Sequence, residues 1–482
     1  MELRELVTAA TGRGSLDACD LVGDPTVDVT AATHDSRQVR AGTLFCCVPG
    51  ARHDGHDFAR AAVADGAAAL LVERRLDLGV PELVVPSVRA AMGPLSAALA
   101  GFPSEQLQVV GITGTNGKTT IAHLLGSIAA AAGRSAGVIG TLTGARTTPE
   151  APELQAQLAA MLAEGRDLVA MEVSSHALDL HRVDGTRFRV AVFTNLSQDH
   201  LDHHRTMEAY FSAKARLFGP DLCDLAVLNL DEPHGRLLAD TVQVPYVGYS
   251  IDQAGDLQLT AAGSHFRWEG VTIELALPGR FNVSNALAAA TAAAALGIPH
   301  DQIAAGLSAT GVVQGRFERI DQGQPFLAAV DYAHTPDGLR QLLEAARELA
   351  SGRVIVVFGA GGDRDPGKRP QMGAAAAELA DVTVLTTDNP RGEDPAAIIS
   401  AVHDGMDHPN DLRIEPDRAA AIALAVAEAR PGDVVLVAGK GHETTQIIGD
   451  VTTEFDDRVV LRGALTAAGW TGGSSGGSGA GA

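Results

Sequence analysis

The chain has 482 residues, of which 46% are hydrophobic and 20% are charged, and its formal net charge is -22. This composition is ordinary for a globular protein and excludes a disordered or fibrous chain, while the length predicts about three domains. The negative charge is spread along the chain, so we expect neither nucleic acid nor an anionic membrane surface as a partner.

The sequence gives no sign of membrane insertion. Residues 1–14 carry charges where a signal peptide needs an apolar core, and the most apolar stretch, 285–298, is too short to span a bilayer. The four cysteines form neither a disulfide framework nor C-x-x-C pairs. We therefore expect a cytoplasmic protein with reduced cysteines, and we expect it to be a monomer.

The predicted elements begin with a small α/β unit. Short β-rich runs at 43–48, 68–72 and 82–85 alternate with Ala-rich helical stretches, the last of which covers 87–100. This pattern predicts an N-terminal α/β domain over residues 1–103.

From residue 107 the pattern changes to strands that alternate with helices. Apolar strands are predicted at 107–112, 136–140, 168–173, 190–196 and 225–228. Such alternation predicts a mostly parallel sheet with functional sites at the carboxyl ends of its strands. We assign residues 104–313 to this central domain.

A third block repeats the alternation. Strands are predicted at 326–331, 354–359, 382–387 and 434–438, with helices at 336–350 and 417–429. This predicts a C-terminal, Rossmann-like doubly wound α/β domain over 314–470, with its boundary near 311–315. Residues 471–482 are rich in Gly and Ser, which predicts a flexible extension without a catalytic role.

A phosphate-binding loop is predicted directly after the strand at 107–112. The loop reads Thr113-Gly-Thr-Asn-Gly-Lys-Thr-Thr120 and precedes a helical run. In such loops, backbone N–H groups cradle phosphates, the lysine reaches the outer phosphates and the following Thr binds magnesium. The alternative is a Gly-rich turn with a surface lysine. The predicted nucleotide contacts are Gly114, Thr115, Asn116, Gly117, Lys118, Thr119 and Thr120.

Acidic and histidine side chains follow two further strands of the central domain. Glu172 ends one strand, and His200 lies in the segment after another. A carboxylate beside a bound nucleotide is a suitable Mg²⁺ ligand, although a lone Glu is more often a cap or an ion-pair partner. The spacing of His200, His203 and His204 does not match a zinc site, and we expect His203 and His204 to be solvated loop residues.

Lysine is scarce in this chain. Lys118, Lys214, Lys368 and Lys440 are the only lysines among 37 basic residues, which leaves 37 minus 4, or 33, arginines. A position that only needed positive charge could carry arginine, so these four indicate sites where an amine is required.

Together these motifs resemble the Mur ligases. The resemblance rests on the loop Gly114-Thr-Asn-Gly-Lys-Thr, on Glu172-Val-Ser-Ser-His, on Thr194-Asn-Leu-Ser-Gln-Asp-His-Leu-Asp and on Ala213-Lys-Ala, and it extends from Asp35 to Arg458. Closest is the ligase that adds the third residue of the peptidoglycan stem peptide.

The resemblance implies an ATP-dependent ligase for peptidoglycan precursors that forms an acyl phosphate. It implies Mg²⁺ held by Thr119, Glu172, His200 and a carbamylated Lys214; these residues except Thr119, together with Lys118, would be catalytic. Carbamylation is chemically sensible because only a neutral amine takes up CO₂, and burial favours that state. Further nucleotide contacts implied by the resemblance are Asn282, Asn285, Arg316, Asp331 and His334; as residues alone, they could be helix caps or turn residues.

The resemblance also assigns two substrates. Ser36, Thr147, Thr148, Ser174 and Arg182 match positions that hold UDP-MurNAc-L-Ala-D-Glu, although Leu180 departs from the Gln found there in some members. The residues that match the pocket for meso-diaminopimelate are Arg364, Asp388, Asn389, Pro390, Arg391, Gly439 and Glu443. A guanidinium offers two parallel donors to a carboxylate, so Arg391 is the expected selector for the second carboxylate of diaminopimelate.

Several alternatives are open at this point. A lysine-adding ligase would share the layout, and so would a folate polyglutamylating ligase, although the latter is not expected to carry the N-terminal motif. A P-loop switch that hydrolyses nucleotide only to change conformation is the alternative from another class. The run Gly359-Ala-Gly-Gly-Asp-Arg is not a dinucleotide fingerprint, because Arg364 occupies the place of its third glycine.

Overall fold

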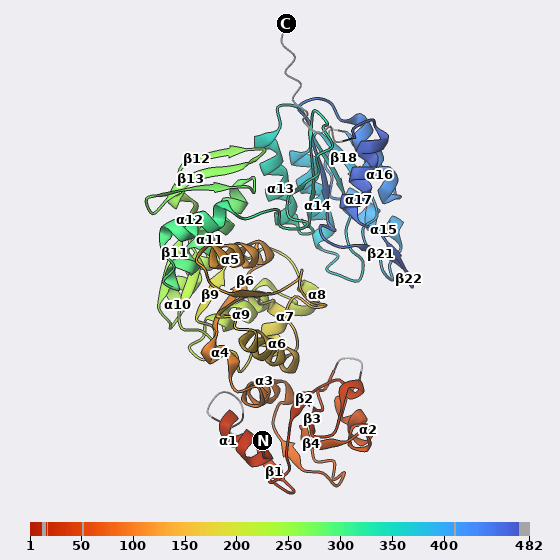
Figure 1. The fold of residues 1–482 in the computed structure, drawn as a ribbon. Coiled ribbons are helices and arrows are strands. Elements are labelled where there is room, and N and C mark those ends of the chain that lie inside the picture. The colour runs from red at the N-terminus through yellow and green to blue at the C-terminus, as the bar shows by residue number, and fades with distance from the viewer. Residues whose placement is uncertain (12–15, 17, 51–52, 409–410, 472–482) are drawn as a thin grey trace.

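The computed structural model describes residues 1–11, 16, 18–50, 53–408 and 411–471. Three α/β units follow one another from the N-terminus to the C-terminus (Figure 1). The tail predicted from residue 471 lies outside the described residues except for its first residue. No described helix has both the length and the apolar character needed to cross a membrane.

The N-terminal domain contains a five-stranded sheet in the order β1-β5-β4-β3-β2. Strands β2 to β5 are parallel, and β1 pairs with β5 in the antiparallel direction. The strands are β1 (Asp20–Val22), β2 (Ala31–Thr33), β3 (Thr43–Cys46), β4 (Ala67–Val72) and β5 (Glu82–Val84), and the helices are α1 (Leu3–Ala10), α2 (Ala59–Ala64) and α3 (Val88–Leu99).

Helix α3 joins this domain to the central one at backbone contact distance. A Cβ atom added to Gly93 of α3 would lie 2.1 Å from the carbonyl oxygen of Asp184, and one added to Gly185 would lie 2.8 Å from the carbonyl carbon of Gly93. Glycine is required at both positions because no side chain fits between the two backbones. The backbones of the N-terminal and central domains are therefore in direct contact here.

The central domain is built on a six-stranded parallel sheet in the order β11-β10-β9-β6-β8-β7. Its strands are β6 (Gln108–Thr113), β7 (Ala136–Ile139), β8 (Leu168–Glu172), β9 (Val190–Phe193), β10 (Ala226–Asn229) and β11 (Tyr246–Tyr249). Its helices are α4 (Pro103–Gln106), α5 (Lys118–Ala131), α6 (Ala151–Ala163), α7 (Ser175–Asp179), α8 (Leu201–His204), α9 (Met207–Ala215), α10 (Pro233–Thr241), α11 (Arg280–Ala295) and α12 (His300–Ser308).

Both faces of this sheet are buried. Val110 and Ile112 of β6 pack into the core formed with α5 and α11, whereas Val109 packs into the core on the opposite face, which includes α6 residues. Strands covered on both faces are apolar along their whole length, which is why they read as continuous hydrophobic runs in the sequence.

A three-stranded antiparallel sheet was not predicted. It consists of β12 (Gly255–Thr260), β13 (Gly263–Trp268) and β14 (Val271–Leu275), and it lies beside α12 (Figure 1). Phe266, Trp268 and Ile273 pack one face of it against the central core, and the other face carries polar side chains. The sheet extends the central domain and does not form a unit of its own.

The C-terminal domain has a six-stranded sheet in the order β15-β16-β20-β17-β18-β19, parallel except for β15. The strands are β15 (Glu318–Arg319), β16 (Leu327–Asp331), β17 (Val354–Phe358), β18 (Val382–Leu385), β19 (Leu412–Ile414) and β20 (Val434–Ala438), followed by the hairpin β21 (Thr445–Ile448) and β22 (Val451–Glu454). Helices α13 (Pro336–Leu349), α14 (Lys368–Leu379) and α15 (Pro395–His403) cover one face, and α16 (Arg418–Glu428) and α17 (Asp457–Ala467) cover the other.

The second face of this sheet holds a buried ion pair. Arg418 and Asp457 have fully buried side chains, and the guanidinium donates two hydrogen bonds of 2.7 Å to the carboxylate. Arg418 also donates to the carbonyl oxygen of Ala438, where β20 ends. The pair therefore fixes α16 and α17 to the end of a central strand.

The predicted fold class is confirmed, with a small α/β domain, a central mostly parallel sheet and a doubly wound C-terminal domain. The precise boundaries at 103 and 313 remain predictions.

Candidate active site

The predicted phosphate-binding loop connects β6 to α5, and two of its positions require glycine. A Cβ atom on Gly114 would lie 1.8 Å from Thr194 Oγ1, and one on Gly117 would lie 2.3 Å from Asn285 Oδ1. Gly117 has φ of +89°, a conformation that side chains disfavour. Lys118 Nζ donates to the carbonyl oxygens of Gly114 and Thr115, so its amine lies over the loop.

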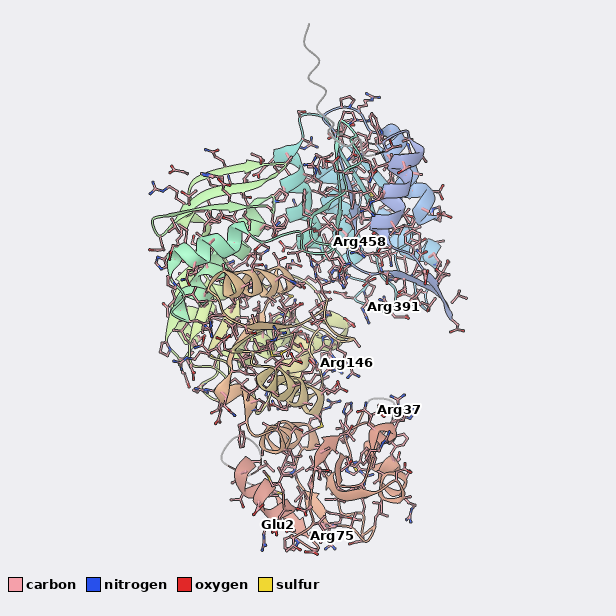
Figure 2. The ribbon with its side chains drawn as sticks, viewed as in Figure 1. Glu2, Arg37, Arg75, Arg146, Arg391 and Arg458 are labelled. Atoms are coloured by element: carbon pink, nitrogen blue, oxygen red, sulfur yellow. The ribbon has the colours of Figure 1, made fainter. Side chains whose placement is uncertain are left out.

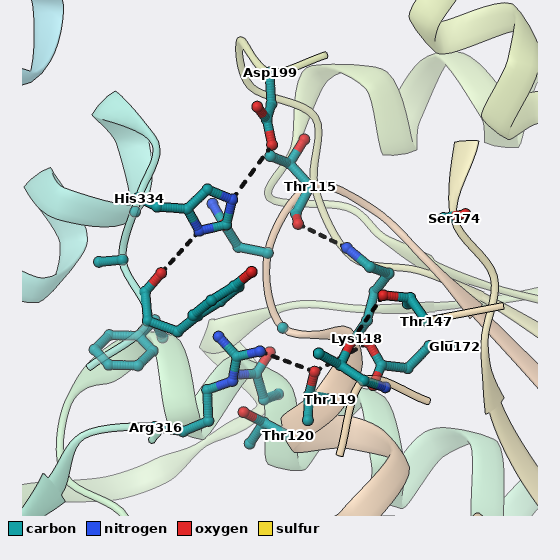
Figure 3. Close-up of a pocket in the computed structure, with 18 of the residues that line it drawn as sticks. Thr115, Lys118, Thr119, Thr120, Thr147, Glu172, Ser174, Asp199, Arg316 and His334 are labelled. Atoms are coloured by element: carbon teal, nitrogen blue, oxygen red, sulfur yellow. Dashed lines mark hydrogen bonds and ion pairs between the residues drawn. The ribbon is translucent and has the colours of Figure 1, made fainter. Parts of the chain in front are cut away.

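A cavity lies above this loop and receives residues from two domains (Figure 3). The central domain contributes the loop itself and side chains at strand ends, and the C-terminal domain contributes Arg316, which precedes β15, and the segment that begins at the end of β16. Its lining includes Thr115, Asn116, Gly117, Lys118, Thr119, Thr120, Thr147, Glu172, Ser174, His200, Lys214, Asn285, Arg316, Asp331 and His334. The structure thus brings together most of the residues predicted from distant parts of the sequence.

Glu172 is oriented by hydrogen bonds that leave it facing the cavity. Its carboxylate accepts from Thr119 Oγ1 at 3.0 Å, from the backbone N–H of Thr141 at 2.8 Å and from Thr141 Oγ1 at 3.2 Å. It is therefore neither a helix cap nor a member of an ion pair with Lys or Arg among the described residues. Thr141 was not predicted, because β7 and β8 become neighbours only in the folded sheet.

Lys214, on α9, is almost completely buried. Its Nζ donates to the carbonyl oxygen of Gly114 at 2.8 Å. Burial, and next the nearby charge of Lys118, hold the pKa of the Lys214 amine well below its ordinary value. A neutral amine at this position is nucleophilic, and an anionic derivative of it would compensate the charge of Lys118.

His200 begins the short helix α8 with φ of +56°, an uncommon conformation for a residue other than glycine. Burial lowers the pKa of its imidazole to about 3, so the ring is neutral near pH 7. Its Nε2 lies 3.4 Å from Asp199 Oδ2. A neutral imidazole in this place has a lone pair available for a metal ion.

His204 corrects one expectation. It is not a solvated loop residue: it lies in α8, only 7% of it is exposed, and its Nε2 lies 2.9 Å from Ser175 Oγ. His203 is partly exposed and contacts Asp179. The ring of Tyr210 on α9 stacks on that of His204, a tertiary contact that the sequence pattern does not reveal.

Asp199 connects the central domain to the C-terminal one. Its buried carboxylate lies 3.5 Å from Lys368 Nζ and 3.7 Å from His334 Nε2. Although burial raises the pKa of Asp199, its interactions with His334 and Lys368 hold that pKa well below the ordinary value. Neither Asp199 nor Lys368 was predicted as a site residue; the scarcity of lysine was the available signal for Lys368.

The C-terminal domain also reaches the phosphate-binding loop directly. Arg316 Nη2 donates to Thr119 Oγ1 at 3.0 Å, and its guanidinium lies over the ring of Tyr332 at 4.4 Å. Asp331 accepts hydrogen bonds from the backbone N–H groups of Phe317 and Ala333, so it shapes the turn after β16. The two domains are therefore in contact across the cavity.

A second cavity adjoins the first and lies beside the start of α11. Its lining includes Asn116, Asn195, Glu232, Tyr249, Phe281 and Asn285. Asn282 donates to the carbonyl oxygen of Pro278, and Asn285 donates to Asn282 Oδ1. Both residues lie inside the helix, so the helix-cap alternative does not apply.

The residues expected to hold the nucleotide-sugar substrate fall in two places. Thr147 and Ser174 line the first cavity, and Thr148 hydrogen-bonds Ser174. Arg182 donates to the carbonyl oxygen of Thr148 and pairs with Glu150 at 2.9 Å. Ser36 lies in the N-terminal domain, away from this group. Leu180 follows directly after α7.

The residues expected to hold the amino acid surround the carboxyl ends of β17, β18 and β20. Asn389 Nδ2 donates to Glu443 Oε2 at 2.7 Å, while Asn389 Oδ1 accepts from Lys440 Nζ at 3.2 Å. Burial raises the pKa of Glu443. Asp388, Asn389, Pro390 and Gly439 are buried, and Arg364 is exposed.

Arg391 lies close to these strand ends. Its φ is +52°, and its Nη1 donates to the carbonyl oxygen of Gly362 at 2.7 Å. A Cβ atom on Gly361 would lie 3.1 Å from Arg391 Nη1 and 3.9 Å from Arg364 Cγ, so one small residue separates the two arginines. The roles of both arginines, like those of the other site residues, remain predictions.

The chain belongs to the Mur ligase family. Residues 28–100 match the model described as "Mur ligase family, catalytic domain", residues 112–293 match the Mur ligase middle domain, and residues 315–441 match the "Mur ligase, glutamate ligase domain".

Individual relatives cover nearly the whole chain. It is 47% identical to a UDP-N-acetylmuramoyl-L-alanyl-D-glutamate–2,6-diaminopimelate ligase of Streptomyces coelicolor over 92% of this chain and 93% of the relative. It is 46% identical to a ligase of the same name from Geobacillus kaustophilus over 92% and 96% of the two chains.

A solved structure with this name aligns with a TM-score of 0.68 and 33% identity, covering 97% of this chain and 99% of that one. A folylpolyglutamate synthase of Mycobacterium tuberculosis, solved with ADP and AMPPCP, shares the fold at a TM-score of 0.58 and 21% identity, covering 78% of this chain and 94% of that one.

Proposed function

We propose that this enzyme is the ATP-dependent ligase that joins meso-diaminopimelate to UDP-MurNAc-L-Ala-D-Glu during peptidoglycan precursor synthesis. The observation that carries the proposal is near-full-length identity of 46–47% to ligases named for this reaction, together with the residues after β18 and β20. The lysine-adding ligase and the nucleotide-hydrolysing switch have no comparable support.

The geometry around Asn389 supports an amino acid as the second substrate. Lys440 holds the amide oxygen of Asn389, so its N–H₂ group points at Glu443. The Glu443 carboxylate can accept from an ammonium group, and the arginines on either side of Gly361 can receive carboxylates. Diaminopimelate has two ammonium and two carboxylate groups, so it matches a pocket with both kinds of partner.

The nucleotide-sugar would lie along one side of the molecule. Figure 2 shows Arg37, Arg146 and Arg391, one from each domain, on the same side. Arg37 directly follows Ser36 in the sequence, and its side chain is 88% exposed. Its guanidinium donates two hydrogen bonds to the carboxylate of Asp35. In a chain with a net charge of -22, such local cations can attract an anionic diphosphate.

The donor set at the first cavity fits Mg²⁺ and a carbamylated lysine. Glu172 offers carboxylate oxygens and Thr119 a hydroxyl beside it, and these are ligands that Mg²⁺ prefers. Lys214 is buried near the positive charge of Lys118. A carbamate on Lys214 would therefore place a negative group, which the Lys118 amine attracts, where a second amine would be repelled. Glu172, His200 and Lys214 would hold one ion and Thr119 another. When bound, Mg²⁺ would neutralise charge on the transferring phosphoryl group.

The chain's own residues bind and orient the reactants. Backbone N–H groups of Gly117, Lys118 and Thr119, at the start of α5, would hold the phosphates, and the Lys118 amine would leave the loop carbonyls to reach the outer phosphates. Arg316 would place a second cation there from the C-terminal domain. The cavity between the domains would exclude water, which protects an acyl phosphate from hydrolysis.

The reaction that follows has two steps. A D-glutamate carboxylate oxygen attacks the γ-phosphorus, the bond to the β,γ-bridging oxygen breaks and ADP leaves. The neutral amine of diaminopimelate then attacks the acyl carbon, the bond from that carbon to the bridging oxygen breaks, phosphate leaves with this oxygen, and the nitrogen loses a proton to become the amide. The products are the amide, ADP and phosphate.

A product-mass experiment tests the proposal. The enzyme is offered ATP, Mg²⁺ and UDP-MurNAc-L-Ala-D-Glu with either meso-diaminopimelate or L-lysine. The expected result is an amide product of the mass containing diaminopimelate, with far less product from lysine. A lysine product of equal or greater yield would support the alternative ligase, and phosphate release without any amide would support the switch.

A further inference from the structure

Beside the active site, imidazole rings gather at the ends of two short helices. His176 lies in α7, and His203 and His204 end α8. The ring centroid of His176 lies 4.2 Å from that of His203 and 5.4 Å from that of His204, and the latter two are 4.7 Å apart. The proposed ligase reaction uses neither His203 nor His204.

A carboxylate completes this group. Asp179 ends α7, and its Oδ2 lies 2.8 Å from His203 Nε2. Asp179, His203 and His204 each offer one ligand atom, and these atoms all lie within 4.8 Å of one another. The group is accessible, because the side chain of Asp179 is 49% exposed and that of His203 is 30% exposed.

Two imidazoles and a carboxylate are a set that suits Zn²⁺ and similar transition ions. Zn²⁺ binds such atoms at about 2.0–2.2 Å, and sites with three protein ligands leave a fourth position for water. Tetrahedral ligands at that distance are about 3.4 Å apart, so the Asp179–His203 pair must open slightly and His204 must approach. Asp179 is exposed and His203 is partly exposed, so both can adjust by rotation, whereas the buried His204 would give up its contact with Ser175 Oγ if its Nε2 binds the ion.

We propose that Asp179, His203 and His204 form a binding site for one divalent transition-metal ion, preferably Zn²⁺. This site is separate from the predicted Mg²⁺ site. The ion would take the place of the hydrogen bond between Asp179 and His203. It would connect the end of α7 to the end of α8. The predicted Mg²⁺ site has one imidazole beside oxygen ligands, whereas this site has two imidazoles and one carboxylate, a set that favours Zn²⁺ over Mg²⁺.

The position of the site gives the ion a structural consequence. Helix α7 is preceded by Ser174 and α8 by His200, and the ring of His176 lies 4.7 Å from that of His200. An ion that joins the far ends of both helices would therefore restrict the segments that carry these residues. The expected effect is a higher Tm on adding Zn²⁺.

The test is a calorimetric titration of the full chain with Zn²⁺ in an excess of Mg²⁺, which occupies the oxygen-rich site. The expected result is one Zn²⁺ per chain and a rise in Tm. His203→Phe keeps an aromatic ring against His176 and should weaken Zn²⁺ binding by at least about tenfold. Asp179→Asn should do the same, so the proposal does not depend on one variant.

His234→Phe is the matched control, because His234 is a partly exposed histidine on α10, in ring contact with Phe211. It should bind Zn²⁺ like the unmodified chain. Substitution of Co²⁺ should give a visible absorption band that disappears in His203→Phe. The proposal is overturned if no Zn²⁺ binds in excess Mg²⁺, or if His203→Phe and Asp179→Asn bind it as well as the control.

Discussion

Lys368 Nζ lies 3.5 Å from Asp199 Oδ1, and 5% of the lysine side chain and 7% of the aspartate side chain are exposed. The two residues belong to different domains, and Asp199 directly precedes His200. The pair therefore links the C-terminal domain to the backbone of a predicted metal ligand.

Lys368→Met should lower kcat by about tenfold to a hundredfold, because a small misplacement of reacting groups has effects of this size. Steady-state kinetics with the three substrates measure it. KM for ATP should change much less, since the phosphate-binding loop is untouched. Arg340→Met is the control, because Arg340 pairs with Glu378 on the exposed side of the same domain. Equal effects of the two variants would contradict the assignment.

Removal of CO₂ should lower activity reversibly if Lys214 is carbamylated. The depressed pKa of Lys214 leaves more neutral amine near pH 7 than an exposed lysine with a pKa of about 10.4 would have. As pH falls through the depressed pKa, the amine binds a proton and the carbamate is lost, so activity should fall toward acid. A ¹³C carbamate signal after addition of ¹³C-bicarbonate, absent in Lys214→Ala, measures the modification.

Arg391→Met should raise KM for meso-diaminopimelate by about tenfold to a hundredfold, since one charge-assisted hydrogen-bonding partner contributes about 1.5–3 kcal/mol. KM for ATP should stay the same. Arg413→Met, at an arginine paired with Asp411 and Glu428 in the same domain, is the control. Unchanged KM for diaminopimelate in Arg391→Met would remove Arg391 from the pocket.

Arg418→Met should lower the free energy of unfolding by about 3–5 kcal/mol, because it leaves the carboxylate of Asp457 buried without its partner. Denaturant unfolding followed by circular dichroism measures the loss. The double variant Arg418→Met/Asp457→Leu should recover part of the stability, because the buried charge is then absent. No recovery would mean that the hydrogen bond to Ala438 is the more important interaction.

Gly114→Ala should reduce activity strongly while leaving the fold intact. The new Cβ would lie 1.8 Å from Thr194 Oγ1 and 3.0 Å from the backbone nitrogen of Asn195, so the phosphate-binding loop must move. Gly463→Ala is the control, since nothing lies within 4 Å of a Cβ there and its backbone is not in the positive-φ region. Binding of an ATP analogue, measured by calorimetry, should be lost in the first variant only.

Much of the fold could be predicted because parallel strands buried on both faces are apolar throughout, as Val354 to Phe358 are. The β12–β14 strands alternate buried and exposed residues, as half-buried antiparallel strands do, but they lack the continuous apolar runs that marked the strands of the parallel sheets. The phosphate-binding loop was recognisable from a local motif. The contact of Asp199 with Lys368 could not be predicted from a local motif, because the two residues are distant in sequence and only the docking of two domains brings them together.

The close backbone contact between Gly93 and Gly185 has a consequence for substrate length. Because a side chain at either position would push the two backbones apart, the two glycines set how closely the N-terminal domain, with Ser36, approaches the central domain. The first two domains would then set the length of precursor that fits between Ser36 and Lys118. On the proposed function, we expect a precursor one residue shorter or longer to be a poor substrate, because its terminal carboxylate would lie short of the γ-phosphate or beyond it.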